Sequence, residues 1–131
     1  LLIVAQRLVR TLCKNCKEDY HPTQKEFDTL VQQYGEKDFL ELGIKYTAEL
    51  TIKKSVGCAR CNETGYAGRT GLHECLDGTD EIKRIIMQKA MVEDLRKQSI
   101  KDGMRTLKQD GIHKIFKGDC DLKQVLAVCI V

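Results

Sequence analysis

The sequence has no tryptophan, a single proline and only 5% aromatic residues. So few aromatic side chains leave little surface on which nucleic-acid bases can stack, which disfavours that mode of binding. Low-complexity stretches are also missing, and a composition of 42% hydrophobic and 31% charged residues excludes a disordered chain. We therefore expect a globular chain, since its 131 residues suffice for one ordinary domain or two small modules.

Long hydrophobic runs are missing too. The longest apolar stretches, residues 1–5 and 125–131, are far shorter than the roughly 20 residues that a membrane-spanning helix needs. The chain opens inside an apolar stretch that has neither the basic region nor the small-residue cleavage site of a signal peptide. We expect it to be part of a longer protein.

Cysteine, in contrast, is abundant, with seven residues. Four of them form two C-x-x-C pairs, Cys13 with Cys16 and Cys58 with Cys61. Each pair lets two thiolates point at one cation, and two pairs complete the tetrahedral shell that suits Zn²⁺. Four sulfur ligands leave no open position for water or substrate, so the predicted zinc site is structural.

The cysteine pattern leaves alternatives. The segment between the pairs, residues 17–57, is longer than the roughly 15 to 20 residues of a compact zinc ribbon, so it must loop out and return. A dithiol oxidoreductase is disfavoured because neither pair lies at the strand-to-helix junction of a βαβ unit. Cys75, Cys120 and Cys129 stand alone, and we expect them to be small buried hydrophobic residues.

Hydrophobic periodicity predicts an α+β fold that is mainly helical, a zinc-stapled four-cysteine module followed by a small C-terminal helical cluster. The pattern favours a helix over residues 1–12. Thr23 and Glu26 match a capping box that starts a second helix, which Gly35 ends. Further predicted elements are strands over residues 48–53 and 72–76, and helices that start at Thr79 or Asp80 or cover residues 92–101, 104–116 and 121–128.

Three glycines, Gly65, Gly68 and Gly71, fall within seven residues and predict tight turns or positive φ angles. The stretch is not a phosphate-binding P-loop, because it lacks the Gly-Lys-Ser or Gly-Lys-Thr that opens a helix. The sequence has no P-loop elsewhere either, so we expect that this chain by itself is not an enzyme.

Charge is distributed unevenly, although the net charge is only +3. Residues 18–49 hold eight acidic side chains against three lysines, whereas residues 83–117 hold ten basic side chains against four acidic ones. Such a split favours docking between the two segments, within one chain or between neighbours, although solvated helix faces are the simpler interpretation.

Three longer stretches carry specific motifs. They are AQRLVRTLCxxCK over residues 5–17, VGCxxCNxTGYxGRTGLxE over residues 56–74 and DGMRTLxxDG over residues 102–111. Together with the closing segment 118–128, they closely resemble the C-terminal part of type II secretion and type IV pilus assembly ATPases. Only residues 18–55 show no recognisable motif, and the motifs do not separate secretion from pilus assembly.

The resemblance implies a hexameric bacterial motor that is cytoplasmic and peripheral to the inner membrane through its partners. The implied partners are further copies of the protein and inner-membrane platform or cytoplasmic-domain proteins of the machine, with no nucleic acid. ATP and Mg²⁺ would bind only upstream, because this chain lacks the P-loop and the acidic strand that positions Mg²⁺. The chain itself would have a structural and interaction role.

The resemblance also implies a division of the chain. Residues 1–12 would end the motor ATPase domain, residues 13–66 would form the four-cysteine metal-binding module, and residues 67–131 would form a C-terminal helical subdomain. Arg7 and Arg10 become candidates for contacts with the nucleotide site or the next subunit, with an exposed helix face as the alternative. The competing hypothesis for the whole chain is a zinc-ribbon module that binds nucleic acid or protein, which would need a basic, aromatic-bearing surface near the cysteines.

Overall fold

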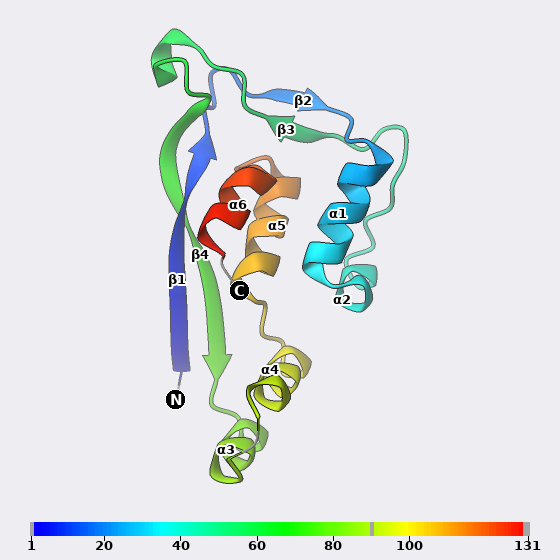
Figure 1. Ribbon diagram of the computed structural model, residues 1–131, viewed down its shortest axis with the longest axis vertical. Coiled ribbons are helices and arrows are strands. Elements are labelled where there is room, and N and C mark those ends of the chain that lie inside the picture. The colour runs from blue at the N-terminus through cyan, green and yellow to red at the C-terminus, as the bar shows by residue number, and fades with distance from the viewer. Residues whose placement is uncertain (1, 90, 130–131) are drawn as a thin grey trace.

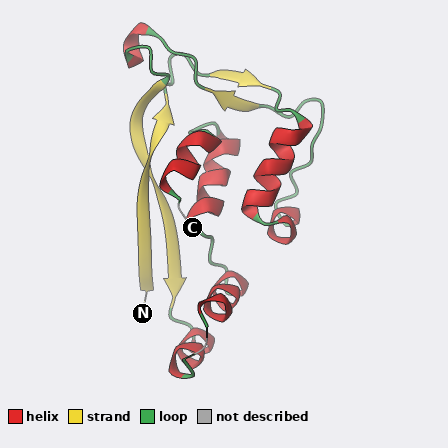
Figure 2. Cartoon of the chain, viewed as in Figure 1, coloured by secondary structure: helices red, strands yellow, loops and turns green. Residues whose placement is uncertain are grey.

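The computed structural model describes residues 2–89 and 91–129 of the chain. They form an α+β fold with six α-helices and two two-stranded sheets, and helices cover more of the chain than strands (Figures 1 and 2). The strands are β1 (Leu2–Leu12), β2 (Glu18–Tyr20), β3 (Ile52–Lys54) and β4 (Tyr66–Asp77). The helices are α1 (Gln24–Tyr34), α2 (Glu36–Leu40), α3 (Asp80–Met87), α4 (Val92–Lys101), α5 (Leu107–Lys117) and α6 (Leu122–Val128).

The first element is a strand, so the helix predicted over residues 1–12 is wrong. β1 pairs antiparallel with β4 from Leu2 opposite Asp77 to Leu12 opposite Tyr66, with a bulge between Arg10 and Leu12. Apolar residues at intervals of three and four favour a helix, but the continuous apolar run of residues 1–5 is equally compatible with a strand, since short apolar runs do not separate the two. Pairing with a partner that lies far away in the sequence decides the outcome.

The glycine-rich stretch is part of the second long strand. β4 starts at Tyr66 and runs through residues 72–76, so the predicted strand is confirmed but extends further toward the N-terminus. Gly65 and Gly68 have φ angles of +85° and +81°, as the glycine pattern predicts, whereas Gly71 lies in the extended strand. The first two glycines therefore shape the entry to a strand rather than a separate turn.

Helix α1 begins as predicted. The Thr23 side chain accepts a hydrogen bond from the Glu26 amide, and the Glu26 carboxylate accepts one from the Thr23 amide, so both halves of the capping box are present. Gly35 ends the helix with a φ angle of +105°. The strand predicted over residues 48–53 is correct only at its end, where β3 begins at Ile52.

The four later helices largely match the predictions. Thr79 rather than Asp80 caps α3, and α4 covers the predicted residues 92–101. α5 begins at Leu107, later than predicted, because Thr106 caps it in a second capping box. Asp121 caps α6 instead of forming its first turn. Side-chain caps therefore set these boundaries more sharply than hydrophobic periodicity does.

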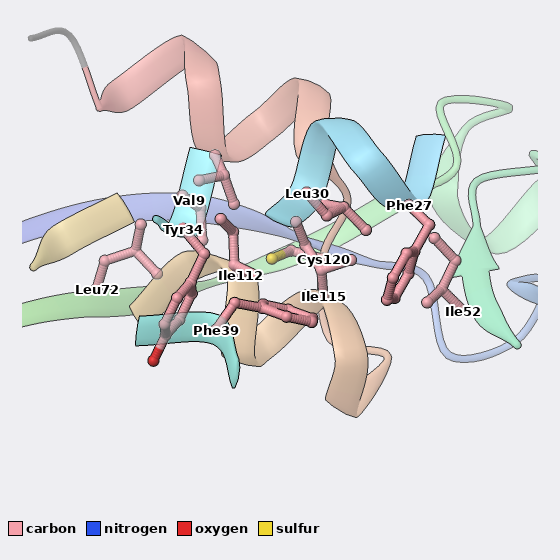
Figure 3. Close-up of a cluster of buried hydrophobic side chains, with 11 residues drawn as sticks. Val9, Phe27, Leu30, Tyr34, Phe39, Ile52, Leu72, Ile112, Ile115 and Cys120 are labelled. Carbon is pink, nitrogen blue, oxygen red and sulfur yellow. The ribbon is translucent and has the colours of Figure 1, made fainter. Parts of the chain in front are cut away.

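The core lies on both sides of α5. Ile112 and Ile115 of α5 are almost completely buried between α1 and the antiparallel pair of β1 and β4, which we call the β1–β4 hairpin although a long segment joins its strands (Figure 3). α6 packs beside α5 so closely that a Cβ atom at Gly111 would lie only 2.6 Å from a methyl carbon of Val125. The remaining buried members of the cluster are Val9, Phe27, Leu30, Tyr34, Phe39, Ile52, Leu72 and Cys120.

The hairpin sets the long dimension of the molecule (Figure 1). Both cysteine pairs lie at the end where β1 finishes and β4 starts, and α3 and α4 lie at the opposite end. Among the described residues, none of the helices combines the length and the apolar character that crossing a membrane requires.

The acidic segment and the basic helices meet through hydrogen bonds rather than ion pairs. The Tyr34 hydroxyl lies 2.9 Å from His113 Nε2, and Gln109 Nε2 donates to the Asp38 carboxylate. None of the five ion pairs among the described residues joins the segment 18–49 to the segment 83–117. Within this part of the chain, the contact between α1 and α5 therefore includes no ion pair between the two segments.

The Tyr34–His113 contact should make the docking of α1 on α5 sensitive to pH. Burial lowers the pKa of His113, and the nearby positive charge of Arg105 lowers it further, with Lys114 adding to this effect and Asp110 opposing it. A lowered pKa in the folded state means that protonation favours unfolding, so His113 stabilises the fold above its ordinary pKa of about 6.5 and does so less at lower pH.

We expect the free energy of unfolding, measured in urea, to fall more between pH 7.5 and 5.5 in the wild type than in His113→Gln. Comparing the two proteins cancels losses that they share, including those from the cysteines. The matched control is His73→Gln, which removes an exposed histidine from β4. A pH dependence in His113→Gln that equals that of the wild type would rule out His113 as the source.

The three lone cysteines have different surroundings. Cys120 is completely buried, as predicted, and Cys129 is half-buried. Cys75 is exposed, so the prediction is wrong there. It lies opposite Val4 on the face of the hairpin that the described helices leave uncovered, where Leu2, Val4 and Leu8 are at least half exposed.

Candidate metal centre

The hairpin brings the two cysteine pairs together. Cys13 and Cys16 follow the last residue of β1, whereas Cys58 and Cys61 precede β4. In an antiparallel pair, the end of one strand lies beside the start of the other. The intervening chain leaves through β2 and returns through β3, whose residues pair from Glu18 with Lys54 to Tyr20 with Ile52. The excursion predicted for residues 17–57 therefore returns next to its starting point.

The four sulfur atoms form one cluster. All four Sγ atoms lie within 4.8 Å of one another. The distances are 3.8 Å from Cys13 to Cys58, 3.9 Å from Cys16 to Cys61 and 3.7 Å from Cys58 to Cys61. A tetrahedron with zinc–sulfur bonds of about 2.3 Å has edges of about 3.8 Å, whereas a disulfide needs about 2.05 Å. The spacing thus fits four sulfur ligands around one ion.

Backbone amides surround the sulfurs with hydrogen-bond donors. The amides of Cys58 and Gly65 both lie 3.2 Å from Cys61 Sγ, and the Gly57 amide lies 3.4 Å from Cys16 Sγ. Amide donors of this kind favour a thiolate over a thiol, since hydrogen bonds to a charged acceptor are stronger. The site is therefore arranged for ionised sulfur.

The pKa values of the cysteines differ within the cluster. Burial opposes ionisation of Cys61, but the amides of Cys58 and Gly65 outweigh it and lower the pKa of Cys61 to about 6. The Asn15 side chain, 3.3 Å from Cys58 Sγ, lowers the pKa of Cys58. Burial raises the pKa of Cys16 to about 12, and hydrogen bonds with the three other thiols add to the rise, although the Gly57 amide opposes it. A divalent cation would reverse this rise, since a coordinating thiol is deprotonated outright.

The second pair depends on unusual backbone angles. A short 3-10 turn, Ala59–Cys61, is followed by Asn62 and Glu63 with φ angles of +55° and +64°. Gly65 follows after Thr64, and a Cβ atom there would lie 2.6 Å from Ser55 Cβ. Sequence reasoning located all four sulfurs, but it missed Asn15 and the amide donors. A polar residue inside the first C-x-x-C and the glycines flanking the second were the available signals.

The cluster is tied to the turn between α5 and α6. The Leu12 amide, next to Cys13, donates to the Asp119 carbonyl, and Lys17 Nζ donates to the Gly118 carbonyl. On the other strand, the Tyr66 hydroxyl donates to the Asp121 carboxylate. Residues on both strands beside the cysteine site therefore form hydrogen bonds to the same turn, the one between α5 and α6.

Arg7 and Arg10 do not share a surface. On the predicted helix they would lie on one face, but an odd spacing on a strand sends side chains to opposite faces. Arg7 lies on the same side as Val9 and lines a cleft beside α5. Arg10 is exposed on the uncovered face, where its guanidinium lies 5.2 Å from the centre of the Tyr66 ring and Arg69 is its strand partner.

Comparison with known proteins identifies the family. A family model described as "Type II/IV secretion system protein" matches residues 1–127. The chain belongs to this family. The match confirms the resemblance seen in the motifs and covers the residues 18–55, which carry no recognisable motif of their own.

Individual relatives agree with this assignment. The chain is 37% identical to a type II secretion system protein E of Aeromonas hydrophila, over 98% of the chain and 23% of the relative. It is 33% identical to the type IV pilus assembly ATPase PilB of Thermus thermophilus, over 95% of the chain and 13% of the relative. The type II secretion system ATPase E of Vibrio cholerae is 33% identical, over 96% of the chain and 22% of that protein. The chain thus spans less than a quarter of the length of these relatives.

Proposed function

We propose that this chain is the C-terminal metal-binding and assembly region of a secretion or pilus-assembly ATPase. The observation that carries the proposal is the cluster of four sulfurs in a member of this family. In it, Cys13, Cys16, Cys58 and Cys61 hold one structural Zn²⁺, which closes the open end of the β1–β4 hairpin. The role is structural, because four sulfur ligands leave no position for a substrate.

The proposal places ATP hydrolysis outside this chain. The parent protein binds ATP and Mg²⁺ in an upstream P-loop domain and acts as a hexamer in the cytoplasm. It is held at the bacterial inner membrane through platform or cytoplasmic-domain proteins of the machine. Relatives named as secretion and pilus assembly ATPases support this assignment over the alternative zinc-ribbon module that binds nucleic acid or protein.

The test compares the chain with the longer protein. We expect the longer protein to hydrolyse ATP and to elute as a hexamer in size-exclusion chromatography with light scattering. The chain alone should hydrolyse no ATP, because it has no phosphate-binding loop. Turnover by the chain above that of a heat-treated sample, or a longer protein without ATPase activity, would contradict the proposal.

Arg7 and Arg10 lie on opposite faces of the hairpin, so we propose different roles for them. We assign the contact with the nucleotide site or the next subunit to Arg10, because its face of the hairpin is left uncovered by the described helices. In the longer protein, Arg10→Ala should lower the rate of ATP hydrolysis. Arg7→Ala is the matched control, and an equal loss in both variants would contradict this assignment.

A further inference from the structure

A second concave site lies away from the cysteines. It is a cleft of about 530 Å³ between the covered face of the hairpin, the end of α1, α4 and the start of α5, with the end of α6 at its side. Small-molecule sites typically measure about 300–1,000 Å³. None of the residues that line the cleft belongs to the cysteine pairs, so the metal centre does not account for it.

The cleft collects positive charge from three elements. Arg7 of β1, Arg96 of α4 and Lys108 of α5 all line it. Arg96 pairs with Glu93, but among the described residues neither Arg7 nor Lys108 is in an ion pair. Lys108 also lies in the first turn of α5, where the helix dipole favours an anion. Two cations in the cleft therefore lack a protein counterion.

The two carboxylates in the cleft are already used by the protein. Glu74 Oε1 accepts a hydrogen bond of 3.1 Å from the Leu107 amide, and so holds the start of α5 against β4. Asp38 Oδ2 accepts a bond of 3.1 Å from Gln109 Nε2, which fastens α2 to α5. Each carboxylate is thus held at one oxygen, and among the described residues neither forms an ion pair with Arg7 or Lys108, so the three cations of the cleft outnumber its two carboxylates.

Apolar side chains complete the lining. Ile100, Leu107 and Val128 contribute hydrocarbon surface, and the Cys129 thiol lies among them. Burial raises the pKa of Cys129, while the charges of Lys108 and Arg7 act against this rise more strongly than Glu74 supports it. The positive charge therefore reaches the apolar end of the cleft.

We propose that this cleft binds a small organic anion, with a phosphate or carboxylate group on Arg7 and Lys108 and an apolar body against Ile100, Leu107 and Val128. Phosphate and carboxylate share the chemistry that a guanidinium and an ammonium recognise. The cation pair supplies the orientation and the hydrocarbon wall supplies the contact area, a combination typical of small-ligand sites. The site is independent of the metal centre and of ATP hydrolysis.

The test uses Cys129 as a reporter inside the cleft and Cys75 as a reporter outside it. The whole chain, loaded with zinc, is alkylated with iodoacetamide, and each cysteine is followed by peptide mass spectrometry. Phenyl phosphate should slow alkylation of Cys129 several-fold and leave Cys75 unchanged. Benzoate tests the carboxylate, and inorganic phosphate tests the anion without the ring. Benzylamine carries a similar ring with the opposite charge and should not protect.

Variants decide whether the cations bind the ligand. Arg7→Gln and Lys108→Gln should each weaken protection at least tenfold in ligand concentration, because a hydrogen bond to a charged group contributes about 1.5–3 kcal/mol. Lys101→Gln is the matched control, because it removes an exposed cation that does not line the cleft. This variant should bind the ligand like the wild type.

A second readout is the change in the NMR chemical shifts of the Leu107 and Gln109 backbone amides when ligand is added. It is measured in the wild type and in variants that keep a native circular dichroism spectrum. Protection by phenyl phosphate or benzoate that both glutamine variants lose would support the site, and which of the two ligands protects would identify the anion. Equal protection by benzylamine, undiminished protection in the variants, or no shift and no protection with either anion would overturn it.

Discussion

Cys58→Ser should abolish zinc binding, whereas the wild-type chain purified under reducing conditions should contain one Zn²⁺. A serine hydroxyl is a poor ligand for zinc, and the loss opens a shell that three sulfurs cannot close. Structural zinc contributes about 10–16 kcal/mol of apparent binding free energy in small peptides, so the effect on folding should be large. Elemental analysis of the purified protein gives the metal content directly.

The matched control is Cys75→Ser, which removes an exposed cysteine near the C-terminal end of β4 and should leave the metal content unchanged. Chelation of zinc from the wild type should first increase hydrogen exchange at Leu12, whose amide donates to Asp119 beside the cluster. Wild-type protein without metal, or Cys58→Ser with a full complement, would show that the four sulfurs are not the ligands.

Ile112→Ala should lower the free energy of unfolding by about 2–5 kcal/mol. Ile112 is completely buried where α5 packs between the hairpin and α1, so truncation leaves a cavity that few neighbours can fill. With a total stability of about 5–15 kcal/mol for an ordinary domain, the variant should be close to unfolding at moderate temperature. Urea denaturation followed by circular dichroism measures the difference.

Ile86→Ala provides the comparison, because it makes the same chemical change on α3, where the side chain is 51% exposed. Its cost should stay well below that of Ile112→Ala, since little apolar surface returns to water. Equal losses in the two variants would mean that α5 is not the centre of the core. The comparison separates burial from the helix propensity of alanine, which favours both variants alike.

Local signals in the sequence predicted most of the helices. The capping box at Thr23 and the helix end at Gly35 act within a few residues, so their consequences can be derived from the neighbouring sequence, whereas the cap at Thr106 was missed and α5 was predicted to start too early. The cysteine pairs were equally informative, because the geometry of zinc restricts how two C-x-x-C segments can meet. In both cases the chemistry depends on short spacings and not on the distant chain.

Strand β1 shows where such reasoning fails. Its apolar residues match a helical period, and only the pairing with β4, more than fifty residues away, makes it a strand. The error also affected the site, because a helix would have put Arg7 and Arg10 on one surface. The cleft proposed to bind an anion could not be predicted for the same reason, since Arg7, Arg96 and Lys108 converge only in the folded chain.

In the proposed function, the cysteine cluster takes the place of the turn of a hairpin. β1 and β4 would ordinarily need a short loop to stay in register, but a metal ion held by the four sulfurs would fix their ends, and the connection between them carries an entire excursion of strands and helices. Once both ends of a connection are anchored, doubling the length of a flexible loop costs only about 0.6 kcal/mol. Residues 41–51 link α2 to β3 without regular structure, but Leu42, Ile44, Tyr46 and Leu50 among them pack against the core, so this link can lengthen at little thermodynamic cost only where these four side chains stay in place. The excursion can therefore gain residues at its surface while the hairpin and the helices packed on it keep their arrangement.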